Sequence, residues 1–189
     1  PLAVGLLGVA LLAWVSGMLH LDGLSDTVDG LTASTDRERS LAVMRSGTAG
    51  PSGVVALVVV LGIQAVGLAS LVSVAHGPWL AAAVVVASRA ALPVACARGV
   101  PAARPDGLGA TVAGSVHPAG AVAVGLLAAA VVWAVALLPG FDLRGLLAPI
   151  LAALALAGCL TLAVRRLGGV TGDVLGACVE VTLAVLLLA

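Results

Sequence analysis

Val54–Val74 reads VVALVVVLGIQAVGLASLVSV, a run of 21 residues that contains no charged side chain. At 1.5 Å per residue, a helix of this length spans about 31 Å, which is enough to cross the hydrocarbon core of a bilayer. Similar apolar runs lie on both sides of it, at residues 2–19, 79–97, 119–138, 146–164 and 170–189. We therefore predict an all-α, polytopic membrane helical bundle of about six transmembrane helices, formed by one domain over residues 1–189.

The composition supports a membrane protein and excludes other classes. Only 10% of the residues are charged and 61% are hydrophobic, whereas a soluble domain carries about 25% charged residues. No basic stripe marks a nucleic-acid partner. Because the chain begins at Pro1 inside an apolar run, we expect an N-terminal part, with at least one more span, to precede it.

The distribution of arginine predicts the orientation in the membrane. Six spans would place residues 20–53, 98–118 and 165–169 on one side, and residues 75–78 and 139–145 on the other. The first side holds seven arginines and the second holds only Arg144. Loops rich in arginine face the cytoplasm. We therefore expect a multi-pass protein of the plasma membrane whose longest polar stretch, residues 20–53, is cytoplasmic.

That polar stretch begins with an acidic motif, HLDGLSDTVDG at residues 20–30. Asp22, Asp26 and Asp29 recur at i, i+4 and i+7, so they share one face of a helix, where like charges repel. Mg²⁺ binds one or two carboxylates and completes its shell with water and phosphate oxygens. We predict a Mg²⁺ site that also holds substrate phosphates, with His20 as a further candidate ligand. The alternative is a solvated face beside the membrane.

A second pair of acids lies in the last apolar run. Asp173 and Glu180 are seven residues apart and therefore share a helical face. A carboxylate within a membrane span is costly, so each is a functional candidate. Asp173 lies near the cytoplasmic end, where it can reach the first acidic cluster. Glu180 lies deeper, and its alternative role is to pair with an intramembrane arginine such as Arg89.

Arginines are the candidate phosphate ligands, because a guanidinium binds phosphate through two parallel hydrogen bonds. The alternative role is topology and contact with lipid headgroups. His117, in a cytoplasmic loop, is a further candidate for substrate contact. The five arginines that we predict to bind phosphate are Arg45, Arg89, Arg104, Arg165 and Arg166.

In their order, these motifs resemble the cobalamin-5′-phosphate synthase family, the adenosylcobinamide-GDP ribazoletransferases. The acidic motif carries most of the resemblance, which extends from about Leu19 to the C-terminus. One departure is the stretch Ser46–Ala49, which lacks the acid or extra basic residue that family members often have. The later stretches that agree are Met44-Arg45 with Gly47, Gly50-Pro51 and Gly53; Ser88-Arg89; Arg104 with Asp106–Gly109; and Gly168–Asp173 with Gly176-Ala177 and Glu180.

The resemblance implies a reaction in cobalamin biosynthesis. The ribose 3′-hydroxyl of α-ribazole, or of its 5′-phosphate, would attack the phosphorus linked to cobinamide in adenosylcobinamide-GDP, and GMP would leave. Mg²⁺ held by Asp22, Asp26 and Asp29 would neutralise the diphosphate. The hydroxyl proton would pass to a carboxylate, for which Asp29 and Asp173 are the candidates.

Two other functions compete with this one. A proton- or cation-coupled multipass transporter would place acids near mid-membrane in several spans, but only Glu180 lies deep here. A phosphotransferase of the CDP-alcohol type would open with Asp-Gly-x-x-Ala-Arg. Asp22-Gly23 is instead followed by Leu-Ser-Asp, which does not match.

Overall fold

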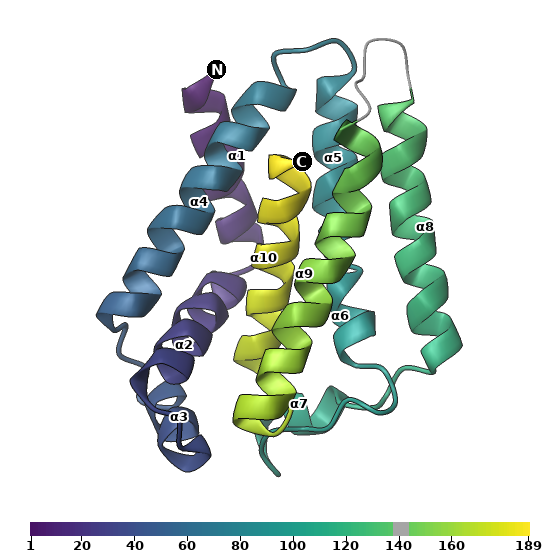
Figure 1. Cartoon of the computed structure of the whole chain (residues 1–189). Helices are drawn as coiled ribbons and strands as arrows, with labels where there is room; N and C mark the ends of the chain where they lie inside the picture. The colour runs from purple at the N-terminus through teal and green to yellow at the C-terminus, as the bar shows by residue number, and fades with distance from the viewer. Residues whose placement is uncertain (138–143) are drawn as a thin grey trace.

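The computed structural model describes residues 1–137 and 144–189, and its elements in this part of the chain are all helices (Figure 1). The all-α prediction is therefore confirmed. The helices are α1 (Leu2–Val15), α2 (Leu19–Ala33), α3 (Arg37–Met44), α4 (Pro51–Leu71), α5 (Gly77–Ser88), α6 (Ala91–Ala95), α7 (Gly107–Val112), α8 (Pro118–Ala136), α9 (Arg144–Leu167) and α10 (Gly172–Leu188).

The membrane bundle is confirmed, but the count of six spans is not. Four segments are long and apolar enough to cross a bilayer, and they are α4, α5 with α6, α8, and α9. A fifth arises only if α1 and α2, which meet at 91°, count as one broken span. The predicted last span, α10, has 17 residues and carries Asp173 and Glu180. The predicted end of the fourth span at Leu138 and most of the loop at 139–145 lie outside the described residues.

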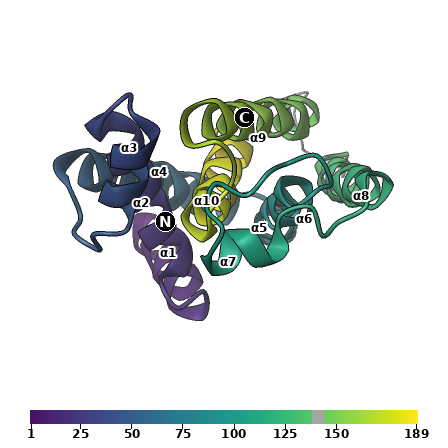
Figure 2. The ribbon, with the colours of Figure 1, turned by 90° about the horizontal axis from the view of Figure 1, so that it is seen from below.

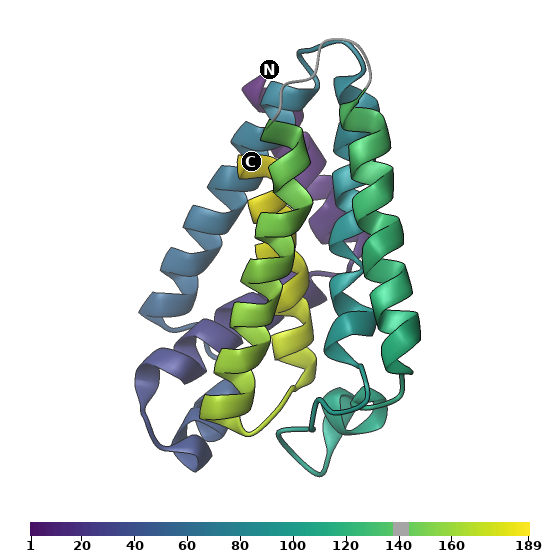
Figure 3. The same cartoon turned by 45° about the vertical axis from the view of Figure 1, so that its right-hand side comes forward.

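The first predicted span, residues 2–19, ends earlier than expected. Helix α1 stops at Val15, and Gly17 and Met18 then adopt left-handed φ angles of 59° and 63°. A left-handed residue cannot continue a right-handed helix, so the chain turns sharply and α2 begins at Leu19. The acidic motif consequently forms a helix of its own, set at a large angle to α1 (Figure 3).

The loops alternate between the two ends of the bundle as the arginine pattern predicted (Figure 1). One end, here called the polar end, carries α3, α7 and the turn between α9 and α10; the connection from α4 to α5 lies at the other. The seven arginines of the three arginine-rich loops therefore gather at the polar end, and Arg144 begins α9 at the opposite end.

Helix α10 is the centre of the bundle. It packs against α2, α4, α5, α6 and α9, and Figure 2 shows it enclosed by its neighbours. Cys178 and Val179 are fully buried, and Leu183 and Val174 are nearly so. Because protein surrounds it, α10 can carry two carboxylates at positions that would be costly in contact with lipid.

Two glycines allow α2 to cross α10 at very short range. A Cβ atom on Gly23 would lie 2.6 Å from the carbonyl oxygen of Asp173, and one on Gly176 would lie 2.9 Å from the Cα of His20. Small residues let helix backbones approach in this way within membranes. The crossing brings the acidic face of α2 onto the first turn of α10.

We expect Gly23→Ala to lower the free energy of unfolding by about 1–3 kcal/mol, because the added methyl group meets backbone atoms that cannot rotate away. The matched control is Gly62→Ala in α4, where a Cβ atom meets nothing within 4 Å. That variant should gain the usual advantage of alanine over glycine in a helix, about 1 kcal/mol. Thermal unfolding of the detergent-solubilised protein measures both. A Gly23→Ala variant as stable as the control would contradict the close crossing.

Candidate functional site

Asp22 and Asp26 lie one turn apart on α2, beside the crossing with α10. Asp22 is exposed and Asp26 is only 8% exposed. Asp26 experiences the negative charges of Asp22, Asp29 and Asp173 and the positive charge of Arg104. Within the described residues, no protein group donates a hydrogen bond to the side chain of Asp22 or Asp26. These two carboxylates are therefore available to an external partner.

Asp173 faces them from the first turn of α10. Its Oδ2 accepts hydrogen bonds from Arg104 Nη2 at 3.0 Å and from Thr171 Oγ1 at 3.1 Å. The Thr171 oxygen also caps α10 by accepting the N–H of Val174 at 3.2 Å. Since both donors use Oδ2, the second oxygen of Asp173 is left without a donor among the described residues.

The turn between α9 and α10 places Arg104 beside Asp173. Gly168 and Gly169 have φ angles of 80° and 152°, which reverse the chain directly after α9. The Val170 N–H then donates to the Pro101 carbonyl at 2.9 Å, and the Ala103 N–H donates to the Val170 carbonyl at 2.9 Å. These backbone bonds hold residues 101–103 against the start of α10, so Arg104 meets a carboxylate 69 positions later in the chain.

Asp29, predicted as both a metal ligand and a catalytic residue, contacts the N-terminus of α4. Its Oδ2 accepts the Gly50 N–H at 2.7 Å and its Oδ1 accepts the Gly53 N–H at 2.8 Å. A helix N-terminus has unpaired N–H groups and favours negative charge. A Cβ atom on either glycine would collide with this carboxylate, which explains the spacing Gly50-Pro51-x-Gly53. Asp29 therefore fastens α4 to α2.

The donor chemistry of the site fits Mg²⁺. Within the described residues, no three His, Cys, Asp or Glu side chains are already gathered closely enough to hold a metal ion. Mg²⁺ does not require such a cage, because it usually keeps several waters and takes one or two carboxylates together with substrate phosphates. Asp22 and Asp26, which accept no protein hydrogen bond among the described residues, would supply two carboxylate ligands.

Glu180 joins three helices inside the bundle. Its Oε2 accepts from Gln64 Nε2 of α4 at 2.7 Å, and its Oε1 lies 3.5 Å from His20 Nδ1 of α2. Arg89 donates instead to the Val85 carbonyl and Ser88 Oγ, and among the described ion pairs there is none between Arg89 and Glu180. Sequence reasoning missed Gln64, although a lone glutamine in an apolar run is a signal of a buried polar partner.

Two further arginines predicted to bind phosphate also contact protein groups. Arg166 Nη2 donates to the carbonyls of Leu31 and Ser34, at 3.1 and 2.7 Å, and so binds the C-terminal end of α2. Arg45 pairs with Asp106 through contacts of 2.6 and 2.9 Å at the surface.

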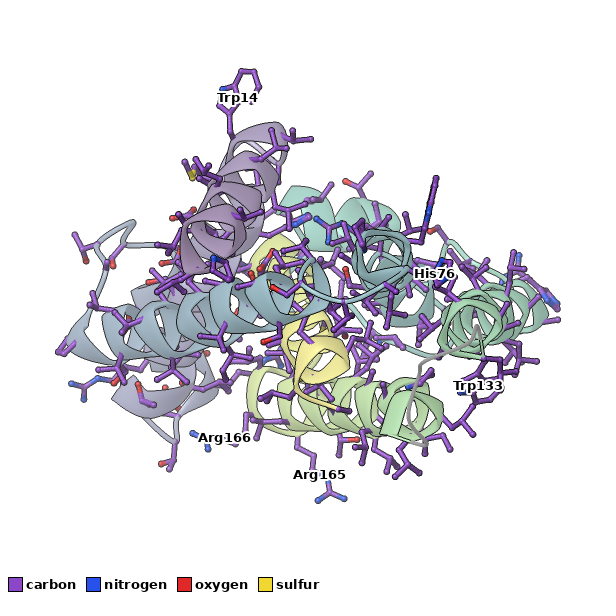
Figure 4. The ribbon with its side chains drawn as sticks, turned by 90° about the horizontal axis from the view of Figure 1, so that it is seen from above. Trp14, His76, Trp133, Arg165 and Arg166 are labelled. Atoms are coloured by element: carbon purple, nitrogen blue, oxygen red, sulfur yellow. The ribbon has the colours of Figure 1, made fainter. Side chains whose placement is uncertain are left out.

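The remaining basic candidates lie apart from the acids. Arg165 is exposed and points away from the bundle (Figure 4). His117 caps α8, where its Nδ1 accepts the Ala119 N–H at 3.3 Å. Arg37, which we had not predicted to be functional, donates to the carbonyls of Leu167 and Ala103, both at 2.8 Å. Of the five arginines predicted to bind phosphate, only Arg104 pairs with an acid of the predicted site.

Comparison with known proteins identifies the family. The family model described as cobalamin-5-phosphate synthase matches residues 1–189. Three relatives carry the name adenosylcobinamide-GDP ribazoletransferase. The relative from a Nocardioides species is 54% identical over 189 residues, covering all of this chain and 72% of its own length. Those from Bradyrhizobium diazoefficiens and Frankia casuarinae are each 41% identical, covering 94% and 96% of this chain and 66% and 68% of their own lengths.

No solved structure matches the chain. The family model covers the acidic motif of α2, the Arg104 segment and the first turn of α10, which together form the site described above. On the full-length match and on the identity to these relatives, the chain belongs to the cobalamin-5-phosphate synthase family.

Proposed function

We propose that this protein is a Mg²⁺-dependent transferase of cobalamin biosynthesis that acts at the cytoplasmic side of the plasma membrane. It joins adenosylcobinamide-GDP to α-ribazole or α-ribazole 5′-phosphate and releases GMP. The names of the relatives support the substrates. The observation that carries the proposal is the meeting of Asp22 and Asp26 on α2 with the Asp173–Arg104 pair at the polar end of the bundle.

The reaction balances as a phosphoryl transfer. The 3′-hydroxyl oxygen of the ribazole forms a bond to the phosphorus that bears cobinamide, and the bond from that phosphorus to the GMP oxygen breaks. The hydroxyl proton passes to a carboxylate, and GMP leaves with the electron pair. Such reactions depend on positioning and on neutralising charge far more than on covalent help from the protein.

Asp173 is the better placed of the two predicted proton acceptors. Arg104 and Thr171 fix its Oδ2 and so hold the carboxylate in one orientation, while its Oδ1 is left to receive a proton. Both oxygens of Asp29 already accept backbone N–H groups of α4. We therefore assign Asp29 to holding α2 in place and Asp173 to the proton.

Asp22 and Asp26 would hold Mg²⁺, which when bound supplies positive charge that neutralises phosphate oxygens and the leaving group. The carboxylates of this site repel one another without a cation, and the positive charge of Arg104 offsets part of that repulsion at Asp26. Arg104 lies close enough to Asp173 to contact a phosphate that approaches the same carboxylates. The other predicted phosphate ligands, Arg45, Arg89, Arg165 and Arg166, receive no such support.

The transporter alternative loses its main support in the structure. Its argument rested on Glu180, the one deep carboxylate, and this group accepts a hydrogen bond from Gln64 at the junction of three helices. These contacts support a role for Glu180 in holding the helices together.

The decisive experiment supplies adenosylcobinamide-GDP, α-ribazole and Mg²⁺ to membranes that contain the protein, and measures GMP and the corrinoid product. We expect activity that EDTA abolishes and Mg²⁺ restores. The double variant Asp22→Asn, Asp26→Asn should lose activity by about 100-fold or more, as expected when charge stabilisation of a transition state is lost. The matched control is Glu38→Gln, an exposed acid of α3. Activity that persists in EDTA would refute the metal site.

Asp29→Asn separates a structural role from a metal ligand. Asparagine keeps one acceptor oxygen but loses the charge at the start of α4, so we expect a loss of stability of about 1 kcal/mol. The Mg²⁺ concentration that gives half-maximal activity should stay unchanged, whereas Asp26→Asn should raise it. A similar rise in both variants would make Asp29 a ligand, as the acidic motif first suggested.

Arg104→Gln should lower kcat/KM by about 10- to 100-fold, because the substitution removes a charge-assisted hydrogen bond from Asp173 and a positive charge from the site. Arg39→Gln, an exposed arginine of the same end, serves as its control. Equal effects of the two substitutions on steady-state kinetics would show that only the overall charge of the polar end matters.

A further inference from the structure

An apolar groove lies between α8 and α9, away from the acidic site. Its volume is about 670 Å³, and residues of α5, α6, α8, α9 and α10 line it. Thr182 and Leu186 are the residues of α10 that line it, and Thr182 lies nine positions after Asp173, on the opposite face of that helix. Helices α8 and α9 are the least buried of the four spans, at 17% and 22%. The groove is thus open to the bilayer.

The side chains that line the groove favour a hydrocarbon ligand. Alanine, valine, leucine and isoleucine form most of the wall, and Gly125 widens it. The indole N–H of Trp133, near one end, donates to the Leu146 carbonyl at 2.9 Å and is not available to a ligand (Figure 4). The Thr182 hydroxyl is the remaining polar group, and one group cannot orient a polar ligand. The apolar side chains of an empty groove lack dispersion contacts on their open side. A bound hydrocarbon chain would supply those contacts.

The groove is longer than the acyl region of one leaflet. On α8 it extends from Pro118 to Trp133, which is about 22 Å at 1.5 Å per residue. The acyl region of one leaflet is about 15 Å thick, half of the hydrocarbon core. A single acyl chain therefore fits along the groove.

Basic residues adjoin the polar end of the groove. Ala97 and Pro118 line it there, and the Arg98 N–H donates to the Val116 carbonyl at 2.9 Å, which keeps residues 98 and 117 together. Arg98 is exposed, and within the described residues no carboxylate pairs with it. His117 uses its Nδ1 to cap α8, so its other ring nitrogen is left for an external partner. This end is suited to an anionic headgroup.

We propose that the groove between α8 and α9 binds one phospholipid, with an acyl chain along the groove and an anionic phosphate at Arg98. The lipid completes the wall of the bundle on the side away from the acidic site. Neither the transfer reaction nor its substrates enter this argument, so the proposal stands independently of the proposed function.

Trp133 reports on the groove directly. The chain has three tryptophans, and Trp14 and Trp79 are 76% and 70% exposed, so Trp14→Phe with Trp79→Phe leaves Trp133 as the only emitter at little cost to folding. The detergent-solubilised protein is titrated with phosphatidylglycerol, and separately with phosphatidylcholine, brominated on their acyl chains. We expect saturable quenching, with phosphatidylglycerol bound about fivefold more tightly because of Arg98.

Variants in this background locate the lipid. Gly125→Leu fills the groove, and a Cβ atom there meets nothing within 4 Å, so quenching should fall. Gly158→Leu in α9 is the matched control, because its Cβ atom also meets nothing and it does not line the groove. Arg98→Gln should remove the preference for phosphatidylglycerol, and Arg39→Gln should not.

Three outcomes would overturn the proposal. Quenching that rises without saturation and equally for both headgroups would mean that Trp133 meets only bulk lipid. Absence of quenching would mean that a second copy or another protein segment covers the groove. Quenching unchanged in a folded Gly125→Leu variant would place the lipid elsewhere. The comparison of headgroups and the Arg98→Gln variant decide the question even if Gly125→Leu fails to fold.

Discussion

The close crossing of α2 over α10 is the constraint on which the site depends. At Gly23 the backbone of α2 lies so near the backbone of Asp173 that no side chain fits between them. At Gly176 the same holds against His20. Each glycine leaves space for the backbone of the other helix. The crossing therefore fixes the distance between α2 and α10 and their relative rotation. The acidic face of α2 and the first turn of α10 are held together as a result.

Other contacts prevent α2 from shifting along α10. Glu180 accepts a hydrogen bond from Gln64 and lies beside His20, so one carboxylate joins α10, α4 and the start of α2. At the other end of α2, Asp29 binds the N-terminus of α4, and Arg166 binds the final carbonyls of α2. Helix α2 is therefore anchored at both ends, which the proposed phosphate site requires.

The acids divide according to their partners. Asp29 and Glu180 meet protein donors that are themselves part of the framework. Asp173 meets Arg104 and Thr171 through one oxygen only. Asp22 and Asp26 meet no protein donor among the described residues. Asp26 is buried, and buried polar groups normally find partners, so its unpartnered carboxylate near Arg104 supports the proposed cation site. The proposed transferase mechanism rests on this difference between the acids that have protein donors and those that do not.

The sequence by itself determined the class of the fold, the end of the bundle where the arginines gather and the acidic motif, because hydrophobic run length, positive charge in loops and helical spacing are local properties of the chain. It also predicted that Asp173 would join the acids of residues 20–30. Only the tertiary structure decided which partners these side chains contact. Asp29, Arg45 and Arg166 were indistinguishable from ligands in the sequence, since a carboxylate that caps a helix and one that binds a metal look alike until its neighbours are placed. The pairing of Gln64 with Glu180 likewise depends on residues brought together from far apart in the chain.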